Sequence, residues 1–262
     1  MNVALSYPND SDQAYYSQTD VKLDKKTIKI LAATLASAPE KPNEDTFAVA
    51  YQDIVLFVGV FDGATSLKPI KSLGEQTGAR FASHFLKDTF SQMQATASPK
   101  QLILELNKQL LQTASKFEGS SLADTHTLPS STGTIIKIDL FKNVFSFAHV
   151  GDSFGIAYYY EGHSVGFTDD KNSKFDDKIF KLIADISKEK RITPRVARDD
   201  ERVKKALLEM YTERNNNPNG KGSGVINGDP QVASEMLLPA FGKKYLLKNA
   251  RRNVLLFVLQ GI

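Results

Sequence analysis

Residues 55–66 read Val-Leu-Phe-Val-Gly-Val-Phe-Asp-Gly-Ala-Thr-Ser, an apolar run that ends abruptly at Asp62-Gly63. A continuous apolar run of this length is typical of a buried strand. Such a strand delivers one carboxylate to its own end, where the glycine lets the backbone turn tightly. On this motif alone the pair is most simply a turn signal. A carboxylate on a rigid support nevertheless makes Asp62 the first candidate for a functional side chain.

The composition excludes several classes of function. The chain has 262 residues, of which 41% are hydrophobic, so it can form one large domain or two small ones. The net charge of +3 comes without a basic stripe interleaved with aromatic residues, so nucleic acid is a poor candidate for a partner. The absence of cysteine excludes disulfides, thiolate catalysis and cysteine-based zinc sites.

The sequence shows no targeting or membrane-spanning segment. Its first 25 residues lack a basic segment followed by an apolar one, which a secretory signal would have. No apolar run reaches the roughly 20 residues that a membrane-spanning helix needs. We therefore expect a cytoplasmic protein that does not bind a membrane.

The first half of the chain predicts an arm, three strands and two helices. Residues 1–27 are polar with scattered aromatic residues, and we expect them to form an N-terminal arm. Apolar runs predict strands at residues 28–36, 46–51 and 54–61, and the last two form a hairpin. Apolar residues at helical spacing predict helices over residues 72–94 and from Pro99 onward, after Ser98 as the N-cap.

The second half adds a meander of strands. The predicted strands lie at residues 132–139, 144–150, 155–160 and 164–168. A charged, partly helical region at residues 170–228 follows, and the chain ends in another apolar strand. Strands, two helices and then more strands predict an α+β fold. We expect a central antiparallel β-sandwich flanked by antiparallel helical pairs, in the layer order α-β-β-α.

Acidic residues stand at the ends of three predicted strands. Glu44-Asp45 comes just before a strand, Asp62 just after one, and Asp152 in a Gly-Asp-Ser turn. If these strand ends share one edge of the sandwich, four carboxylates converge and repel one another unless a cation neutralises them. Oxygen ligands of this kind suit Mg²⁺ or Mn²⁺ rather than Zn²⁺. Such a site supports hydrolysis of a phosphoryl group.

Four motifs occur in an order and spacing that resembles the metal-dependent protein phosphatase 2C (PPM-type) family. They are Asn43-Glu44-Asp45, Val60-Phe61-Asp62-Gly63, Ser131-Thr132-Gly133-Thr134 and Ala148-His149-Val150-Gly151-Asp152-Ser153. Residues 224–230, Gly-Val-Ile-Asn-Gly-Asp-Pro, look like a further block of the family. The resemblance implies a phosphatase 2C-like domain over residues 28–262, with residues 170–228 as a variable flap that influences substrate choice.

The resemblance also implies an activity and a set of site residues. The activity is hydrolysis of phosphoserine and phosphothreonine on proteins through a metal-bound water, with two Mg²⁺ or Mn²⁺ ions. Asp62 would bridge both ions, Glu44 and the Gly63 carbonyl would hold one of them, and Asp152 matches a position tied to a third, weaker metal. Asp45 would act in the catalytic site just behind these ligands. The partner would be a phosphoprotein substrate or a regulatory protein.

The sequence departs from the family pattern at several positions. Ala64 stands where many members have a histidine after Asp-Gly, and Lys41 stands in the segment that holds a phosphate-binding arginine. Gln260 replaces a metal-binding aspartate of a late strand, and the chain stops before the segment with the final one. We therefore expect one metal site to be impaired. The alternative function is a weak or inactive pseudophosphatase that binds partners, and an oligomer could cover the edge of the C-terminal strand.

Overall fold

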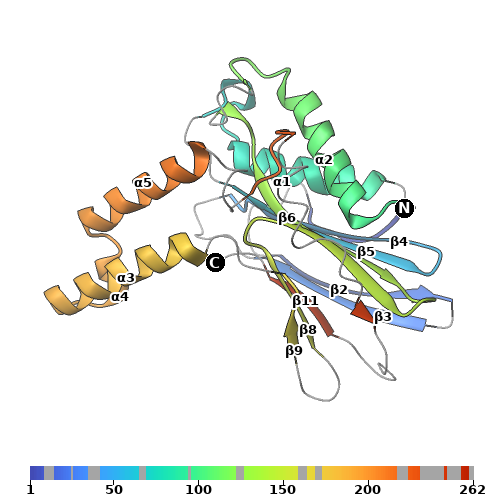
Figure 1. The fold of residues 1–262 in the computed structure, drawn as a ribbon. Helices are drawn as coiled ribbons and strands as arrows, with labels where there is room; N and C mark the ends of the chain where they lie inside the picture. The colour runs from blue at the N-terminus through green and yellow to red at the C-terminus, as the bar shows by residue number, and fades with distance from the viewer. Residues whose placement is uncertain are drawn as a thin grey trace.

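The chain folds as a mixed α+β protein with two layers of antiparallel sheet and helices outside them (Figure 1). The computed structural model describes residues 1–8, 15–24, 26–34, 42–64, 69–93, 96–121, 127–158, 164–168, 173–216, 224–230, 245–246 and 255–259. The predicted site residue Lys41 lies outside these ranges, and so does Gln260, which replaces a metal-binding aspartate of the family pattern. The predicted fold class is confirmed by this architecture.

The larger sheet has six strands in the order β1-β4-β5-β6-β7-β10. Their bounds are β1 Asn2–Ser6, β4 Asp45–Gln52, β5 Val55–Gly63, β6 Ser131–Asp139, β7 Val144–Val150 and β10 Tyr245–Leu246. The other layer contains a two-stranded and a three-stranded sheet. Their strands are β2 Tyr15–Leu23, β3 Lys26–Thr34, β8 Phe154–Tyr158, β9 Ser164–Gly166 and β11 Leu255–Leu259.

Alternate residues of β5 enter two different cores, because successive side chains of a strand point to opposite faces. Phe57 and Phe61 belong to the core shared with the helices, where Phe61 packs edge-on against Phe90 with 6.0 Å between ring centroids. Leu56 and Val60 belong to the core shared with the β2–β3 hairpin. Both faces of β5 are therefore covered, which explains its continuous apolar sequence.

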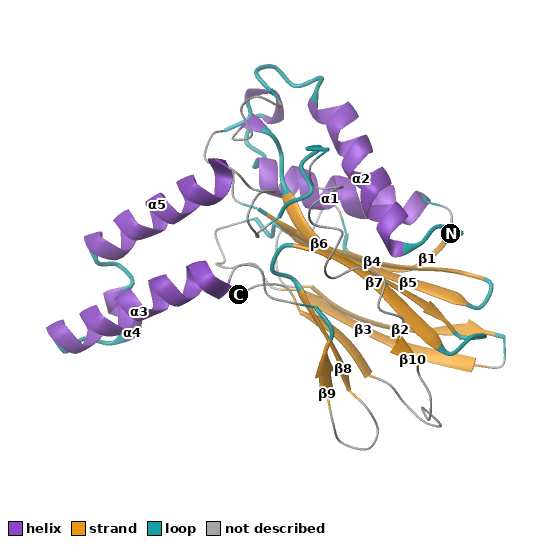
Figure 2. Cartoon of the chain, in the orientation of Figure 1, coloured by secondary structure: helices purple, strands orange, loops and turns teal. Residues whose placement is uncertain are grey.

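Two helices cover the outer face of the six-stranded sheet (Figure 2). They are α1, Gly78–Gln92, and α2, Pro99–Ala114. Thr77 caps α1 and Ser98 caps α2, the latter in a capping box with Gln101. The first helix begins six residues later than the predicted start at Ser72, because residues 71–73 form a single 3-10 turn that ends at Gly74 with φ of 61°.

The first 27 residues differ from the arm that the sequence predicts. They contain β1, which pairs with β4 at the edge of the larger sheet, and β2, which pairs with β3. Leu5, Tyr7, Val21 and Leu23 are buried in the core between the layers. Two of the alternate, less exposed positions of β2 are the polar residues Ser17 and Thr19, so the apolar–polar alternation that indicates a strand is weak in the sequence.

The predicted flap region contains three helices beside the sheets, namely α3 Ser173–Lys190, α4 Pro194–Ala197 and α5 Glu201–Asn216 (Figure 1). They have an apolar core of their own, formed by Ile179, Ile186, Ala197 and Val203 with their partly buried neighbours.

Within the described residues, no helix is long and apolar enough to cross a membrane.

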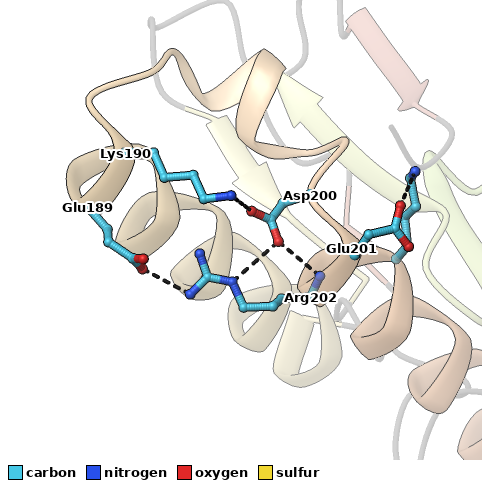
Figure 3. A network of polar contacts seen from close by, with 6 residues as sticks. Glu189, Lys190, Asp200, Glu201 and Arg202 are labelled. Atoms are coloured by element: carbon cyan, nitrogen blue, oxygen red, sulfur yellow. Dashed lines mark hydrogen bonds and ion pairs between the residues drawn. The ribbon is translucent and has the colours of Figure 1, made fainter.

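Asp200 holds the ends of α3 and α5 together (Figure 3). Its carboxylate pairs with Lys190 Nζ at 2.6 Å and with Arg202 Nε at 3.2 Å, and it accepts a hydrogen bond from the Arg202 amide. Arg202 also pairs with Glu189 at 2.9 Å. These partners hold the pKa of Asp200 well below its usual range.

Candidate metal centre

The β4–β5 hairpin brings two of the predicted site residues face to face. Asp45 begins β4 and is the register partner of Asp62 near the end of β5, and their side chains hydrogen-bond to each other. On its other side Asp62 lies opposite Thr132 of β6. The antiparallel register thus fixes both carboxyl groups at one end of adjacent central strands.

The two carboxyl groups bind protons far more tightly than ordinary aspartates. Burial, followed by the charge of Asp45, raises the pKa of Asp62 from 3.8 to about 9, and the charges of Asp152 and Glu44 add to this. Burial is also the main cause that raises the pKa of Asp45 to about 6. At neutral pH the metal-free pair therefore shares a proton, held mainly by Asp62.

The acidic residues of three separate motifs lie within electrostatic range of one another. Glu44 and Asp152 both act on Asp45 and on Asp62 as nearby negative charges. A cation bound among these groups would relieve the repulsion that now raises both pKa values.

Thr77 connects Glu44 to the start of α1. Its Oγ1 donates to Glu44 Oε1 at 2.5 Å and accepts from the Arg80 amide at 3.1 Å. The Glu44 carbonyl in turn accepts from the Gly63 amide at 3.1 Å. Glu44 is therefore fixed both to the helix and to the end of β5. The hydrogen bond between Thr77 and Glu44 joins residues that are 33 apart in the sequence, and no sequence pattern predicts it.

Gly63 is required by the close approach of α1 to the end of β5. A Cβ at this position would lie 2.6 Å from the carbonyl carbon and oxygen of Ala79, in the first turn of the helix. Because these are backbone atoms, they cannot move aside without shifting the helix. The Asp62-Gly63 pair is thus more than a turn signal, since glycine lets the helix N-terminus approach the carboxylates.

Asp152 lies in the turn between β7 and β8. The preceding Gly151 has φ of 93°, which favours glycine, and a Cβ there would clash with Thr132 at 2.3 Å. The hydroxyls of Thr132 and Ser153 lie 3.3 Å apart, so β6 holds the turn on both sides of Asp152. These contacts keep the half-buried Asp152 close to the carboxyl pair.

The block at residues 224–230 lies beside the same strand ends. Ile226 and Ser131 exchange two backbone hydrogen bonds, of 3.1 and 2.7 Å, and Ser131 Oγ donates to the Asp62 carbonyl at 2.8 Å. Asn107 of α2 accepts from the Gly228 amide and donates to the Asp229 carbonyl. The motifs that the sequence analysis singled out are therefore neighbours in space.

The residues present fit a divalent cation in their chemistry. The carboxylates of Glu44, Asp62 and Asp152 and the Gly63 carbonyl are hard oxygen donors, which suit Mg²⁺ or Mn²⁺. Among the residues that the structure describes, no three acidic or histidine side chains are already arranged around a common point. Asp45 and Asp62 instead bond to each other, so binding a cation requires them to separate and to lose the proton they share.

Other features of the chain lie outside this centre. Ala64 follows Gly63, and its amide donates a hydrogen bond to the Ser130 carbonyl. Its side chain is a methyl group, which cannot donate or accept a proton. An open cavity of about 720 Å³ lies between α1 and α2 and is lined by residues that include Gln92, Thr96 and Gln101. None of the predicted site residues lines that cavity.

Comparison with known proteins gives a family match. The family described as Protein phosphatase 2C matches residues 22–205. No curated protein matches the sequence significantly.

Several solved structures are similar at low identity. RsbX in complex with magnesium is 16% identical with a TM-score of 0.36, covering 63% of this chain and 64% of that one. The serine/threonine phosphatase Stp1 from Staphylococcus aureus is 14% identical with a TM-score of 0.37, covering 99% and 74%. The serine/threonine phosphatase of S. agalactiae is 15% identical with a TM-score of 0.36, covering 72% and 65%. The chain spans 59 to 64% of the length of the first three structures it matches.

Proposed function

The chain belongs to the protein phosphatase 2C family, and we propose that it hydrolyses phosphoserine and phosphothreonine on proteins with Mg²⁺ or Mn²⁺. The observation that carries this proposal is the pair formed by Asp45 and Asp62, whose pKa values are both raised. Buried carboxyl groups that repel one another are costly to the fold, and a functional cation site is the simplest reason to keep them.

The proposed ligands come from the elements that converge at the centre. Asp62 would lie between two cations, Glu44 and the Gly63 carbonyl would hold one of them, and Asp152 would hold a further, weaker one. When bound, the cations would neutralise charge on the phosphate oxygens and would lower the pKa of a bound water. The chain's own residues set the geometry, because Thr77 orients Glu44 and Asp45 orients Asp62.

Proton transfer in the proposed reaction depends on Asp45. We propose that Asp45 accepts a proton in the reaction, because its carboxyl group lies directly beside that of Asp62. Ala64 has no group that could protonate the leaving serine or threonine oxygen. We propose that Lys41, by its positive charge, contributes to binding of the phosphate.

A regulatory protein that binds partners without turnover is the second candidate. Two sequence observations favour it, namely Ala64 in place of a proton donor and Gln260 in place of a carboxylate. A neutral amide oxygen contributes less to holding a divalent cation than a carboxylate does. The two candidates share the same metal-binding residues near Asp62 and differ in whether turnover follows.

Turnover of p-nitrophenyl phosphate and of a phosphothreonine peptide, measured against Mn²⁺ concentration, separates the candidates. We expect Mn²⁺-dependent turnover that Asp62→Asn abolishes. Asp53→Asn is the matched control, because Asp53 lies in the turn at the other end of the hairpin with φ of 54°, which asparagine tolerates. Equal turnover by wild type and Asp62→Asn would contradict the proposal. Tight partner binding without turnover at millimolar Mn²⁺ would favour the second candidate.

A further inference from the structure

Asn43 precedes the two acidic residues at the start of β4 and is only 1% exposed. Its Oδ1 accepts from the Asp45 amide at 3.1 Å, and its Nδ2 donates to Thr34 Oγ1 at 3.0 Å and to the Tyr7 hydroxyl at 3.4 Å. The orientation of the side-chain amide is determined, because the Asp45 amide can only donate and so must face the oxygen. Asn43 thereby ties the ends of β1 and β3 to the backbone of Asp45.

Tyr7 is itself fixed at several points. Its amide donates to the Phe47 carbonyl at 3.0 Å, and its own carbonyl accepts from Lys87 Nζ at 2.8 Å. Lys87 comes from α1 and is only 1% exposed, so a buried ammonium group holds the end of β1 against the helix. The Tyr7 ring packs edge-on against Tyr15 and His84. The Tyr7 hydroxyl thus has little freedom to move away from Asn43.

We propose that Asn43 is a positioning residue for the metal centre and that Tyr7, in the first eight residues, supports it. This inference rests on the proposed function. Asn43 fixes the backbone at Asp45. The side chains of Glu44 and Asp45 are attached to this fixed stretch of backbone. Thr77 holds the tip of the Glu44 side chain and the Gly63 amide holds its carbonyl. Asn43 adds a further fixed point at the next residue, Asp45, and so limits the direction in which both acidic side chains point. The matched family segment begins only at residue 22, so part of this support lies before it.

The inference predicts that Mn²⁺ affinity depends on groups that do not touch the metal. Asn43→Ala is expected to raise the Kd for Mn²⁺ about tenfold, which is typical of losing an outer support of a metal ligand. Tyr7→Phe and Thr34→Val each remove one acceptor of the Asn43 amide and are expected to raise the Kd by a few-fold. Thr34→Ser keeps the hydroxyl and restores the wild-type Kd. Tyr15→Phe is the matched control, because Tyr15 packs on Tyr7 and, among the described residues, is not a hydrogen-bond partner of Asn43.

Titration calorimetry with MnCl₂ on the full chain tests this, with circular dichroism to verify that each variant is folded. A double-mutant cycle distinguishes positioning from general stability. If Tyr7 acts through Asn43, Tyr7→Phe raises the Kd in the wild-type background and leaves it unchanged in the Asn43→Ala background. A merely structural role gives the same effect in both.

The outcomes separate this inference from the function on which it rests. If wild type binds Mn²⁺ and the folded variants bind it with unchanged Kd, the role of Asn43 is overturned. The proposed function is then unaffected. Equal effects of Tyr7→Phe in both backgrounds would also overturn it. Wild type that fails to bind millimolar Mn²⁺ would overturn the proposed function, and the positioning role with it.

Discussion

Asp45 and Asp62 hydrogen-bond to each other across adjacent strands. Burial is the main cause that raises both pKa values, and the charges of Glu44 and Asp152 add to it, whereas Asp45 raises only the pKa of Asp62. Both groups bind protons more tightly in the folded chain than in the unfolded chain. Under linkage, a state that binds more protons loses stability as the pH rises. The centre therefore destabilises the metal-free protein most at alkaline pH, and a cation can relieve this destabilisation.

At the scale of single residues this gives a pH dependence of stability. In the presence of a chelator, the free energy of unfolding is expected to fall as the pH rises from about 4 to about 9, the interval between the ordinary value of 3.8 and the raised pKa of Asp62. Asp62→Asn should remove at least about 1.4 kcal/mol of this fall, the equivalent of one pKa unit. Urea denaturation at several pH values measures it.

The control for that pH series is Asp53→Asn, which makes the same chemical change at the far end of the hairpin. It is expected to leave the slope against pH unchanged. Parallel curves for wild type and Asp62→Asn would mean that the Asp62 carboxyl titrates normally, and the account of the carboxyl pair would then be wrong.

The elements that the sequence predicts best are those buried on both faces. The predicted strand at residues 54–61 became β5 because its alternate residues, such as Leu56 and Phe57, enter separate cores. The hairpin with β4 then follows from the short turn, and it places Asp45 opposite Asp62. Much of the acidic cluster could therefore be predicted from strand ends alone.

The start of α1 could not be predicted in the same way. The chain at Ser72 continues the apolar helical pattern, but the helix begins only at Gly78 because Gly74 turns the backbone first. The contact between Thr77 and Glu44 depends on that later start, and no periodicity in the sequence encodes it. A threonine before a helix predicts an N-cap. Its hydrogen bond to Glu44 cannot be predicted in this way, because it forms only when the helix packs on the sheet.

The cap of α1 therefore has two roles that matched variants can separate. Thr77→Val loses the N-cap, at a cost of about 1 kcal/mol, and also the hydrogen bond to Glu44. We expect lower thermal stability and about tenfold weaker Mn²⁺ binding, because an outer support of the ligand is lost. Thr77→Ser should restore both. Thermal melts and Mn²⁺ calorimetry provide the two measurements.

Ser98→Ala is the control, because Ser98 caps the neighbouring helix α2 and contacts none of the acidic residues of the centre. It is expected to lower stability by a similar amount without changing the affinity for Mn²⁺. If both variants weakened Mn²⁺ binding equally, the effect of Thr77 would come from helix stability and its contact with Glu44 would be irrelevant.

On the scale of the whole molecule, the flap helices and the sheets have separate apolar cores. The core around Ile186 and Val203 shares no residue with the cores on either side of β5. The region at residues 170–228 was predicted as a charged, partly helical flap, and the helices found there agree with its helical part. Which side chains hold them together was not predictable, because the pairing of Asp200 with Lys190 needs the turn through α4.

Loss of Asp200 is therefore expected to loosen the flap alone. Asp200→Ala removes partners of Lys190 and Arg202 and the acceptor for the amide at the start of α5. Hydrogen exchange should become several-fold faster in residues 173–203 and stay unchanged in β4 to β7. Mn²⁺-dependent turnover of p-nitrophenyl phosphate should not change.

Lys204→Ala is the control for the flap variant, because the Lys204–Glu201 pair is exposed and such pairs contribute little. It should leave hydrogen exchange at the wild-type rate. If Asp200→Ala made hydrogen exchange faster throughout the six-stranded sheet, the flap core would not be separate from the cores on either side of β5.

We propose that a divalent cation binds by displacing the proton that Asp62 holds. Calorimetric titration with Mn²⁺ at pH 7, repeated in buffers of different ionisation enthalpy, counts the protons released on binding. With the pKa of Asp62 at about 9, we expect release of about one proton per protein in wild type and close to none in Asp62→Asn, which should also bind Mn²⁺ more weakly. Binding without proton release, or equal binding by Asp62→Asn, would contradict the account.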